Sequence, residues 1–394
     1  MTRNGGGKGG PTLALVWLTA FNFRVVFLGT PPVLPAIRSD VHLSLVATGG
    51  ISSLIVACLG AGALPGALLV NRFGPRIVVA VAGLGLGGGA LARLLPPEAI
   101  WLFAGTAVLA LSVAAAQPGL TLLLRLWFPD RVQRAATLMT LGLFAGGLTG
   151  FGLTPFVAAL LGWRGSFVVW GISALLGAAL WVRFAPAASH ERVASRLGGL
   201  AREPAVWLAA TLFAAQNLAF FNAATWIPFE LHRFGPGRVA LVLFLSNAVT
   251  IPLALVLARV RRPFATWPGY YLLASGLTAA GAGGLLLGLD GVAWALAMAV
   301  GAGTGLTFMG ALAIPPLVAR HESDVAGFSA LMLGVGYLAG FAGPAVGGAL
   351  ADRSGTVSAS FLPSVVGALA MGVAGLALTR LPRPGRAEPA AGGD

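Results

Sequence analysis

The stretch LVATGGISSLIVACLGAGALPGALLV, residues 45–70, contains no Asp, Glu, Lys or Arg and is followed directly by Asn71 and Arg72. A helix of about 20 mostly apolar residues is long enough to cross the hydrocarbon core of a bilayer. The apolar residues form one continuous run and do not alternate with polar residues, as they would in a strand of a membrane β-barrel. The stretch therefore predicts a membrane-spanning α-helix.

Eleven further runs of this kind fill most of the 394-residue chain. Hydrophobic residues make up 57% of the sequence and charged residues 9%, whereas soluble domains carry about 25% charged residues. This composition excludes a soluble enzyme, a nucleic-acid binder and a disordered scaffold. We expect twelve transmembrane helices, near residues 12–37, 45–70, 77–95, 99–124, 135–160, 165–184, 205–229, 239–258, 267–288, 291–318, 326–350 and 357–379.

The distribution of Lys and Arg predicts the orientation of these spans, because cytoplasmic loops of membrane proteins carry an excess of both. With the N-terminus inside, eighteen of the 25 Lys and Arg residues fall in inner loops and six in outer loops. The six outer residues are Arg38, Arg93, Arg164, Arg233, Arg238 and Arg353. The net charge of +13 is scattered between apolar runs and forms no patch for nucleic acid. We therefore expect both termini in the cytoplasm and the protein in the inner membrane, surrounded by lipid.

The longest predicted loop separates the spans into two sets of six. The expected organisation is a cytoplasmic tail over 1–11, a six-helix bundle over 12–184, a cytoplasmic linker over 185–204, a second six-helix bundle over 205–379 and a cytoplasmic tail over 380–394. Only one cysteine, Cys58, is present, which excludes a disulfide within the chain.

Two glycine-rich stretches at matching positions relate the two halves. Span five contains Gly142-Leu-Phe-Ala-Gly-Gly-Leu-Thr-Gly150, and span eleven contains Gly334-Val-Gly-Tyr-Leu-Ala-Gly-Phe-Ala-Gly343. The offset between them is close to half the chain length. Twofold repeats of this kind build transporters whose halves rock about a site near the midplane of the membrane. The sequence thus predicts an all-α membrane protein made of two pseudo-symmetric six-helix bundles.

The loop between spans two and three, Ala67-Leu-Leu-Val-Asn-Arg-Phe-Gly-Pro-Arg76, resembles the loop motif G-x-L-A-D-R-x-G-R-K of the major facilitator superfamily. Arg72, Gly74 and Arg76 match this motif, whereas Ala67 replaces its first glycine and Asn71 its aspartate. The resemblance implies the major facilitator fold, transport by alternating access, a monomeric protein and a gating role for residues 71–76.

Further stretches resemble the cyanate, nitrite and 2-nitroimidazole porter group of that superfamily. They are Asn22-Phe-Arg24, Leu126-Trp-Phe-Pro-Asp-Arg-Val132, Gly162-Trp-Arg-Gly165, and Gln216-Asn-Leu-Ala-Phe220 with Trp226-Ile-Pro228. A fuller copy of the loop motif, Gly348-Ala-Leu-Ala-Asp-Arg-Ser-Gly355, falls between spans eleven and twelve, outside in our topology. The resemblance implies that span one lines the central cavity and that span seven lies across from it.

Arg24 is the one charged residue that these boundaries place inside a span and away from its ends. It lies roughly 18 Å of helix from the inner end of span one, and an arginine there costs about 2.5–3.5 kcal/mol on insertion scales. No carboxylate is predicted inside a span to pair with it, and a guanidinium fork suits small oxyanions and carboxylates. We predict that Arg24 binds an anionic substrate; the alternative is a structural arginine satisfied by helix carbonyls and water.

Further candidates for substrate binding are uncharged. Gln216, Asn217 and Phe220 share one face of span seven, Gln117 precedes Pro118 in span four, and Tyr337 lies in span eleven. Their alternative role is hydrogen bonding between helices.

Two further sets of residues have weaker claims to the site. Asn22 is a secondary candidate, because a regular helix points it about 200° away from Arg24. Thr304 and Phe308 share a face of span ten and are expected to pack between helices.

The function predicted from these features is transport of a small anion, cyanate- or nitrite-like or a small carboxylate, with Arg24 as its ligand. The alternative is efflux of neutral or cationic compounds, of drug or nitroimidazole type. We expect no enzyme activity, cofactor or metal, because His42, His190, His232 and His321 are isolated in predicted loops. Because no Asp, Glu or His lies inside a span, we expect anion exchange, a substrate that brings its own proton, or facilitated flow.

Overall fold

The computed structural model describes residues 9–96, 98–188, 197–200, 202–258, 264–318 and 324–381, and the described residues form helices and turns without a strand. The α-helices are α1 (Gly9–Leu28), α2 (Leu34–Val41), α3 (Leu45–Phe73), α4 (Pro75–Ala92), α5 (Glu98–Trp127), α6 (Val132–Phe184), α7 (Leu197–Leu200), α8 (Pro204–Leu231), α9 (Pro236–Ala248), α10 (Thr250–Ala258), α11 (Pro268–Leu286), α12 (Ala293–Val318), α13 (Asp324–Gly340), α14 (Gly343–Ser354) and α15 (Leu362–Arg380). Residues 1–8, 189–196 and 382–394 of the predicted tails and linker lie outside the described residues.

Ten stretches of the described chain are long and apolar enough to cross a membrane. One of them, Arg134–Phe184, contains two helices joined at Gly162, whose φ of 72° and ψ of 169° break the helix at a position that favours glycine. The helix α11 adds a further stretch of 19 residues. With Arg134–Phe184 counted as two spans and α11 added, the described helices are consistent with the twelve predicted spans.

Three predicted spans are interrupted where the sequence alone predicts continuous helices. The first passes from α1 through a 3₁₀ turn, Pro31–Val33, into α2. The eighth is divided at Val249 into α9 and α10, and the eleventh is divided into α13 and α14 just before Pro344. Proline lacks a backbone N–H and interrupts helical hydrogen bonding, which accounts for the first and third breaks.

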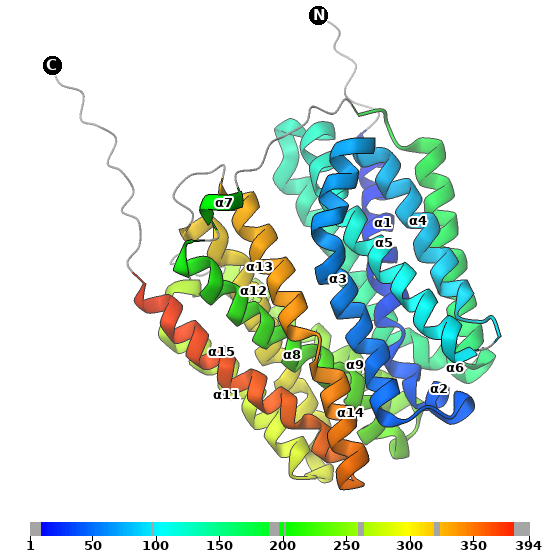
Figure 1. Cartoon of the computed structure of the whole chain (residues 1–394), viewed down its shortest axis with the longest axis vertical. Helices are drawn as coiled ribbons and strands as arrows, with labels where there is room; N and C mark the ends of the chain where they lie inside the picture. The colour runs from blue at the N-terminus through cyan, green and yellow to red at the C-terminus, as the bar shows by residue number, and fades with distance from the viewer. Residues whose placement is uncertain are drawn as a thin grey trace, which may run out of the picture.

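The helices form two bundles, one from α1–α6 and one from α8–α15 (Figure 1). We call the end of the molecule at which α1 begins and α15 ends the terminal end, and the opposite end the distal end. The two bundles meet toward the distal end, where α14, α9 and α2 lie, and diverge toward the terminal end (Figure 1).

The glycine-rich stretches of the two halves pack in equivalent ways. A Cβ added to Gly142 or Gly146 would lie 2.5 Å from the carbonyl oxygen of Trp17 or 2.2 Å from that of Phe21, both on α1. On α13, a Cβ added to Gly340 would lie 2.8 Å from the carbonyl oxygen of Ala214 on α8. Small residues let helix backbones approach closely. The repeat thus reflects one structural unit used twice, in which the fifth helix of a bundle packs on the first.

The distal contact between the bundles joins α3 to α14. Asp352 of α14 accepts hydrogen bonds from the backbone N–H groups of Leu45 (3.3 Å) and Val46 (3.0 Å), which begin α3. Ser53 Oγ accepts another from the backbone N–H of Ala345 (3.1 Å). The first N–H groups of a helix have no partner within it and carry partial positive charge, so a carboxylate binds them well. A residue of the fuller loop-motif copy therefore joins the two bundles.

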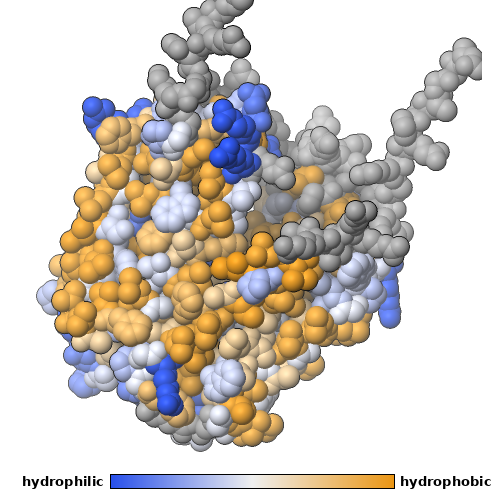
Figure 2. Space-filling view, turned by 180° about the vertical axis from the view of Figure 1, so that it is seen from behind, coloured by the Kyte–Doolittle hydropathy of each residue, from blue (hydrophilic) through white to orange (hydrophobic). Residues whose placement is uncertain are grey.

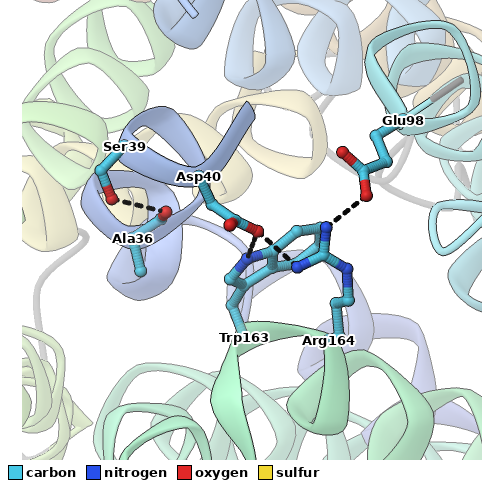
Figure 3. A network of polar contacts seen from close by, with 6 residues as sticks. All are labelled: Ala36, Ser39, Asp40, Glu98, Trp163 and Arg164. Carbon is cyan, nitrogen blue, oxygen red and sulfur yellow. Dashed lines mark hydrogen bonds and ion pairs between the residues drawn. The ribbon is translucent and has the colours of Figure 1, made fainter. Parts of the chain in front are cut away.

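An ionic network holds the distal end of the N-terminal bundle (Figure 3). Arg164 of α6 donates hydrogen bonds to Asp40 of α2 and Glu98 of α5, and its guanidinium carbon lies 4.2 Å from the centre of the Trp163 ring. The indole N–H of Trp163 also donates to Asp40, at 2.9 Å. The predicted motif Gly162-Trp-Arg-Gly165 thus closes a turn and connects three helices of one bundle.

Apolar side chains cover much of the outer surface, as Figure 2 shows for one face. Large exposed hydrophobic residues include Leu160 (85% exposed), Val373 (72%) and Leu369 (63%). Such a continuous apolar surface is stable when lipid surrounds it, since a soluble monomer rarely exposes large apolar patches.

Candidate functional site

A cavity of about 280 Å³ lies between the two bundles. Helices α1, α5 and α6 line it from the N-terminal bundle, and α8, α9, α10, α12 and α13 line it from the C-terminal bundle. Its polar or charged lining residues are Arg24, Gln117, Thr140, Gln216, Asn217, Asn247, Thr250, Thr304 and Tyr337. The other lining residues are glycine or apolar, including Phe220 and Phe308.

The cavity opens toward the terminal end. Gln117 lies in the later part of α5, Thr140 in the first part of α6 and Leu312 late in α12, which places all three on the terminal side, and all three are exposed. Deeper lining residues are buried, with Gln216 at 4% and Thr304 at 1% exposure. Because the α3–α14 contact closes the distal end, access to this cavity is from one side.

Arg24 lies in the cavity wall and is partly exposed. Its guanidinium carbon is 5.6 Å from the centre of the Phe27 ring on the same helix, and Tyr337 lines the same cavity from the opposite bundle. The structure gives Arg24 no ion pair with any described residue. Among the described lining residues it alone carries a charge, so its N–H donors are available to a ligand.

The structure brings together all but one of the predicted substrate-binding residues. Gln216, Asn217 and Phe220 face the cavity from α8, Tyr337 faces it from α13, and Gln117 lies near its mouth. Whether they bind a substrate stays a prediction.

Asn22 is the exception, because it lies outside the central cavity. It is 3% exposed and faces the second half of α6, where it accepts a hydrogen bond from Ser173 Oγ (2.9 Å). Its own amide donates to the carbonyl oxygen of Leu18 (3.0 Å). The predicted angle of about 200° from Arg24 accounts for this placement.

Most of the lining residues were not among the predicted site residues. Thr304 and Phe308 line the cavity, although packing was expected for them, and Asn247 and Thr250 line it on either side of the break between α9 and α10. An asparagine and a threonine three residues apart in a predicted span are the only sequence signal for the second pair. Broken helices are common at transporter sites, because they direct backbone and polar groups into the cavity.

The predicted gating loop lies at the terminal end, between α3 and α4. Gly74 has a φ of 84° and joins the helices, Arg76 donates to the carbonyl oxygen of Val182 (3.3 Å), and Arg72 lies over the Phe73 ring. For Asn71, Arg72, Gly74 and Arg76 the structure gives no hydrogen bond to the described part of the C-terminal bundle. A gating role for these residues stays a prediction.

Arg93 is a second arginine whose side chain lies within the helical bundles. It lies at the end of α4, as its predicted place at the outer edge of the third span implies, but its side chain is fully buried. Its guanidinium carbon lies 3.6 Å from the centre of the Phe167 ring, and Nη1 donates to Thr30 Oγ1 (2.8 Å). Arg24 is therefore not the one arginine within the helical bundles.

A one-sided cavity between two helical bundles of equivalent packing, set in an apolar surface, is the architecture of a membrane transporter. The sequence matches the Major Facilitator Superfamily over residues 12–341. The chain belongs to this family.

Relatives of known sequence share nearly the full length of the chain. It is 26% identical over 386 residues to the 2-nitroimidazole transporter of Escherichia coli (strain K12), an alignment that covers 93% of this chain and 95% of that protein. It is 24% identical over 373 residues to the uncharacterized transporter YycB of Bacillus subtilis (strain 168), with 90% of each chain covered.

Solved structures share the fold at low sequence identity. A bacterial homologue of the human lysosomal transporter Spinster, in an inward-facing and occupied conformation, matches with a TM-score of 0.75 at 14% identity, covering 95% of this chain and 97% of that chain. A D-xylose–proton symporter matches with a TM-score of 0.73 at 14% identity, covering 94% and 96%.

Proposed function

We propose that this chain transports a small anion by alternating access, with Arg24 as the anion ligand. The observation that carries the proposal is the isolated positive charge of Arg24 in the wall of the cavity, where the described lining contains no Asp or Glu. A charge inside a membrane protein needs a partner, and a substrate anion supplies one that arrives and leaves during transport.

The surroundings of Arg24 support binding of an anion over binding of a cation. The guanidinium group presents a planar fork of N–H donors, which forms paired hydrogen bonds with a carboxylate or another oxyanion. The apolar residues around it lower the local dielectric constant, so attraction to an anion is stronger there than in water. The same field repels a cationic compound, which leaves a neutral compound as the alternative substrate.

Transport of a neutral nitroimidazole-type compound is the second proposal. Its support is the 26% identity to a 2-nitroimidazole transporter and the aromatic side chains of Phe220, Phe308 and Tyr337 in the cavity lining, which suit a flat ring. In this case Arg24 contacts a neutral acceptor, and its removal weakens binding less.

The bundles are in contact at the distal end and apart at the terminal end, which supports a cycle in which they rock about the cavity. In the topology predicted from Lys and Arg, the terminal end faces the cytoplasm and the structure represents an inward-open state. An anion that enters a negative-inside cell opposes about 2.3 kcal/mol per 100 mV. Accumulation therefore requires exchange against a second anion or a substrate that carries its own proton.

Thermal unfolding of the purified protein with a panel of small anions tests the proposal. A ligand present at 100 times its dissociation constant stabilises the folded state by about 2.7 kcal/mol. We expect one class of anion to raise the melting temperature of the wild type, and Arg24→Ala to abolish this shift.

Arg125→Ala is the matched control, because Arg125 is exposed near the terminal end of α5 and lies outside the cavity. It removes the same charge and should retain the shift. An anion shift that survives in Arg24→Ala, or a wild type stabilised by neutral nitroimidazoles and by no anion, would contradict the first proposal and favour the second.

A further inference from the structure

Two asparagines in the cavity have their amide orientation fixed by their own helices. Asn217 Nδ2 donates to the carbonyl oxygen of Phe213 (2.9 Å), and Asn247 Nδ2 donates to that of Leu243 (3.0 Å). A carbonyl oxygen can only accept, so in both residues the amide nitrogen must face the helix backbone. The remaining amide atom, Oδ1, is the group that each side chain can offer to the cavity that it lines.

The accessibility of these oxygen atoms supports this orientation. Asn222 Oδ1, which lies away from the cavity, is both sealed from solvent and without a hydrogen bond, and the same holds for Gln216 Oε1 in the cavity wall. Asn217 Oδ1 and Asn247 Oδ1 are not sealed in this way, and the structure gives them no hydrogen-bond donor. Two accessible acceptors therefore face the cavity from α8 and α9.

Two hydroxyl groups beside them are oriented in the same way. Thr250 Oγ1 donates to the carbonyl oxygen of Asn247 (2.6 Å), and Thr304 Oγ1 donates to that of Val300 (2.7 Å). Each hydroxyl has used its one hydrogen, so only the lone pairs of its oxygen remain. Gln216 differs, because the structure ties neither atom of its amide to the backbone and its Oε1 is sealed, which leaves its N–H donors as the groups that it can offer.

The deep part of the cavity thus has a group that only donates on one side and several groups that only accept on the other. From the N-terminal bundle, Arg24 presents N–H donors and no acceptor, and the other polar lining residues of this bundle, Gln117 and Thr140, lie near the mouth. From the C-terminal bundle, Asn217, Asn247, Thr250 and Thr304 present oxygens that can only accept, while Gln216 and Tyr337 can also donate. A ligand that satisfies both walls must accept at one end and donate at the other.

We infer that the substrate is a small organic anion with a neutral N–H or O–H donor at the end away from its anionic group. This inference rests on the proposed function and selects among its substrates. An anion without a donor, such as nitrite, displaces water from these oxygens without replacing its hydrogen bonds, which costs binding free energy. An ammonium donor is disfavoured, because the described lining contains no carboxylate and already carries the charge of Arg24.

A pair of ligands that differ in one group tests the inference on the unmodified protein. Pyrrole-3-carboxylate and furan-3-carboxylate have the same charge and nearly the same shape, but only the pyrrole ring carries an N–H. We expect the wild type to bind the pyrrole about tenfold more tightly in thermal-shift or calorimetric titrations, and N-methylpyrrole-3-carboxylate to bind as weakly as the furan. Both anions should lose binding in Arg24→Ala.

Variants of the acceptors locate the effect. The double substitution Asn217→Leu and Asn247→Leu keeps the side-chain size, and we expect it to bring the pyrrole-to-furan ratio close to one. The matched control is Asn22→Leu, since Asn22 lies outside the cavity, and it should keep the tenfold ratio. If the double variant does not fold, the comparison of the three ligands on the wild type decides the question.

The possible failures are distinguishable. Equal binding of pyrrole and furan anions, or tighter binding of nitrite than of either, with dependence on Arg24 intact, would overturn the donor inference and leave the proposed function standing. A ratio of ten that persists in the folded double variant would also overturn it. If no anion binds in an Arg24-dependent way, the proposed function fails and the inference fails with it.

Discussion

Arg24 and Arg93 both belong to the N-terminal bundle, and the structure gives neither of them an ion pair among the described residues. Arg93 is fully buried, lies 3.6 Å over the Phe167 ring and donates to Thr30. Arg24 is partly exposed to a cavity and lies 5.6 Å over the ring of Phe27. One guanidinium is thus enclosed by its own bundle, and the other faces the space between bundles.

The two arginines differ in the protein groups that surround their charge. An aromatic face at short range and a hydroxyl acceptor stabilise a desolvated guanidinium, by about 2 kcal/mol for the cation–π contact alone. Such a group is part of the packing, and a ligand has no access to it. Arg24 has a weaker aromatic contact and an accessible surface, so its hydrogen-bonding capacity is available to a molecule in the cavity.

The largest effect expected from this comparison is the loss of anion binding in Arg24→Met. Methionine restores most of the volume of the side chain but none of its charge or N–H donors. Because truncating one partner of a desolvated charge pair costs about 2–5 kcal/mol, we expect binding to weaken by at least about 30-fold, as much as in Arg24→Ala. Calorimetric titration with the preferred anion measures this. Binding within tenfold of the wild type would mean that Arg24 acts through its shape.

Substitution of Arg93 by alanine or methionine should change the stability of the protein and leave anion binding largely unchanged. Arg93→Ala removes the cation–π contact and leaves a cavity, so we expect a loss of about 2 kcal/mol in the free energy of unfolding with little change in anion affinity. Arg93→Met fills the space and removes a buried charge, and it should recover most of that loss. Unfolding followed by tryptophan fluorescence in detergent measures both. A stable Arg93→Ala that no longer binds anions would place Arg93 in the transport pathway.

The sequence predicted that Arg24 lies inside a span, but it did not predict that the side chain of Arg93 is buried. Hydropathy locates a charge along a span, and Arg24 is far from either end of its span, whereas Arg93 is near one. Distance from a span end does not show which way a side chain points, and Arg93 turns inward against Phe167. That contact joins residues far apart in sequence, so no local pattern could predict it.

The fold was more accessible to prediction than the site. The two helical bundles follow from the continuous apolar runs and the repeated glycine pattern, because both are local in sequence and their spacing is fixed by helix geometry; the major facilitator fold was implied by the resemblance of residues 67–76 to the family's loop motif. The cavity depends on which helix faces cross the gap between bundles. Spacing within α8 correctly grouped Gln216, Asn217 and Phe220. Asn247 and Thr250 were missed, because the sequence does not show which face of the eighth span is turned toward the other bundle.

A smaller effect is expected when the charge of Arg24 is kept and its geometry is changed. Arg24→Lys retains a cation but replaces the planar fork with a single ammonium that cannot form paired hydrogen bonds with a carboxylate. We expect anion affinity about tenfold below the wild type, between the wild type and Arg24→Met. Titration with the same anion as above gives the comparison. Wild-type affinity in Arg24→Lys would show that charge suffices and that the fork has no role.

The smallest effect is expected on the equilibrium between conformations that are open at the terminal end and at the distal end. Arg24 is accessible because the bundles part at the terminal end while Asp352 caps the first N–H groups of α3 at the distal end. This carboxylate is exposed, so its contact with the helix end is worth about 0.3–1 kcal/mol. Asp352→Asn loses the charge and one acceptor, and we expect it to shift the equilibrium about threefold toward a state that is open at the distal end.

Spin labels at the exposed positions Ser39 and Gly291, in a Cys58→Ser background, report that equilibrium as a distance distribution across the distal end. Asp40→Asn is the matched control, since Asp40 binds Arg164 within one bundle and its loss should lower stability without changing the distance between bundles. A longer-distance population that grows in Asp352→Asn and not in Asp40→Asn is the expected result. Equal populations in Asp352→Asn and the wild type would show that the close backbone contacts of α3 with α14 hold the distal end closed without the carboxylate. A Cβ added to Gly49 would lie 2.1 Å from the carbonyl oxygen of Pro344, so Gly49→Ala would then be the substitution that opens the distal end.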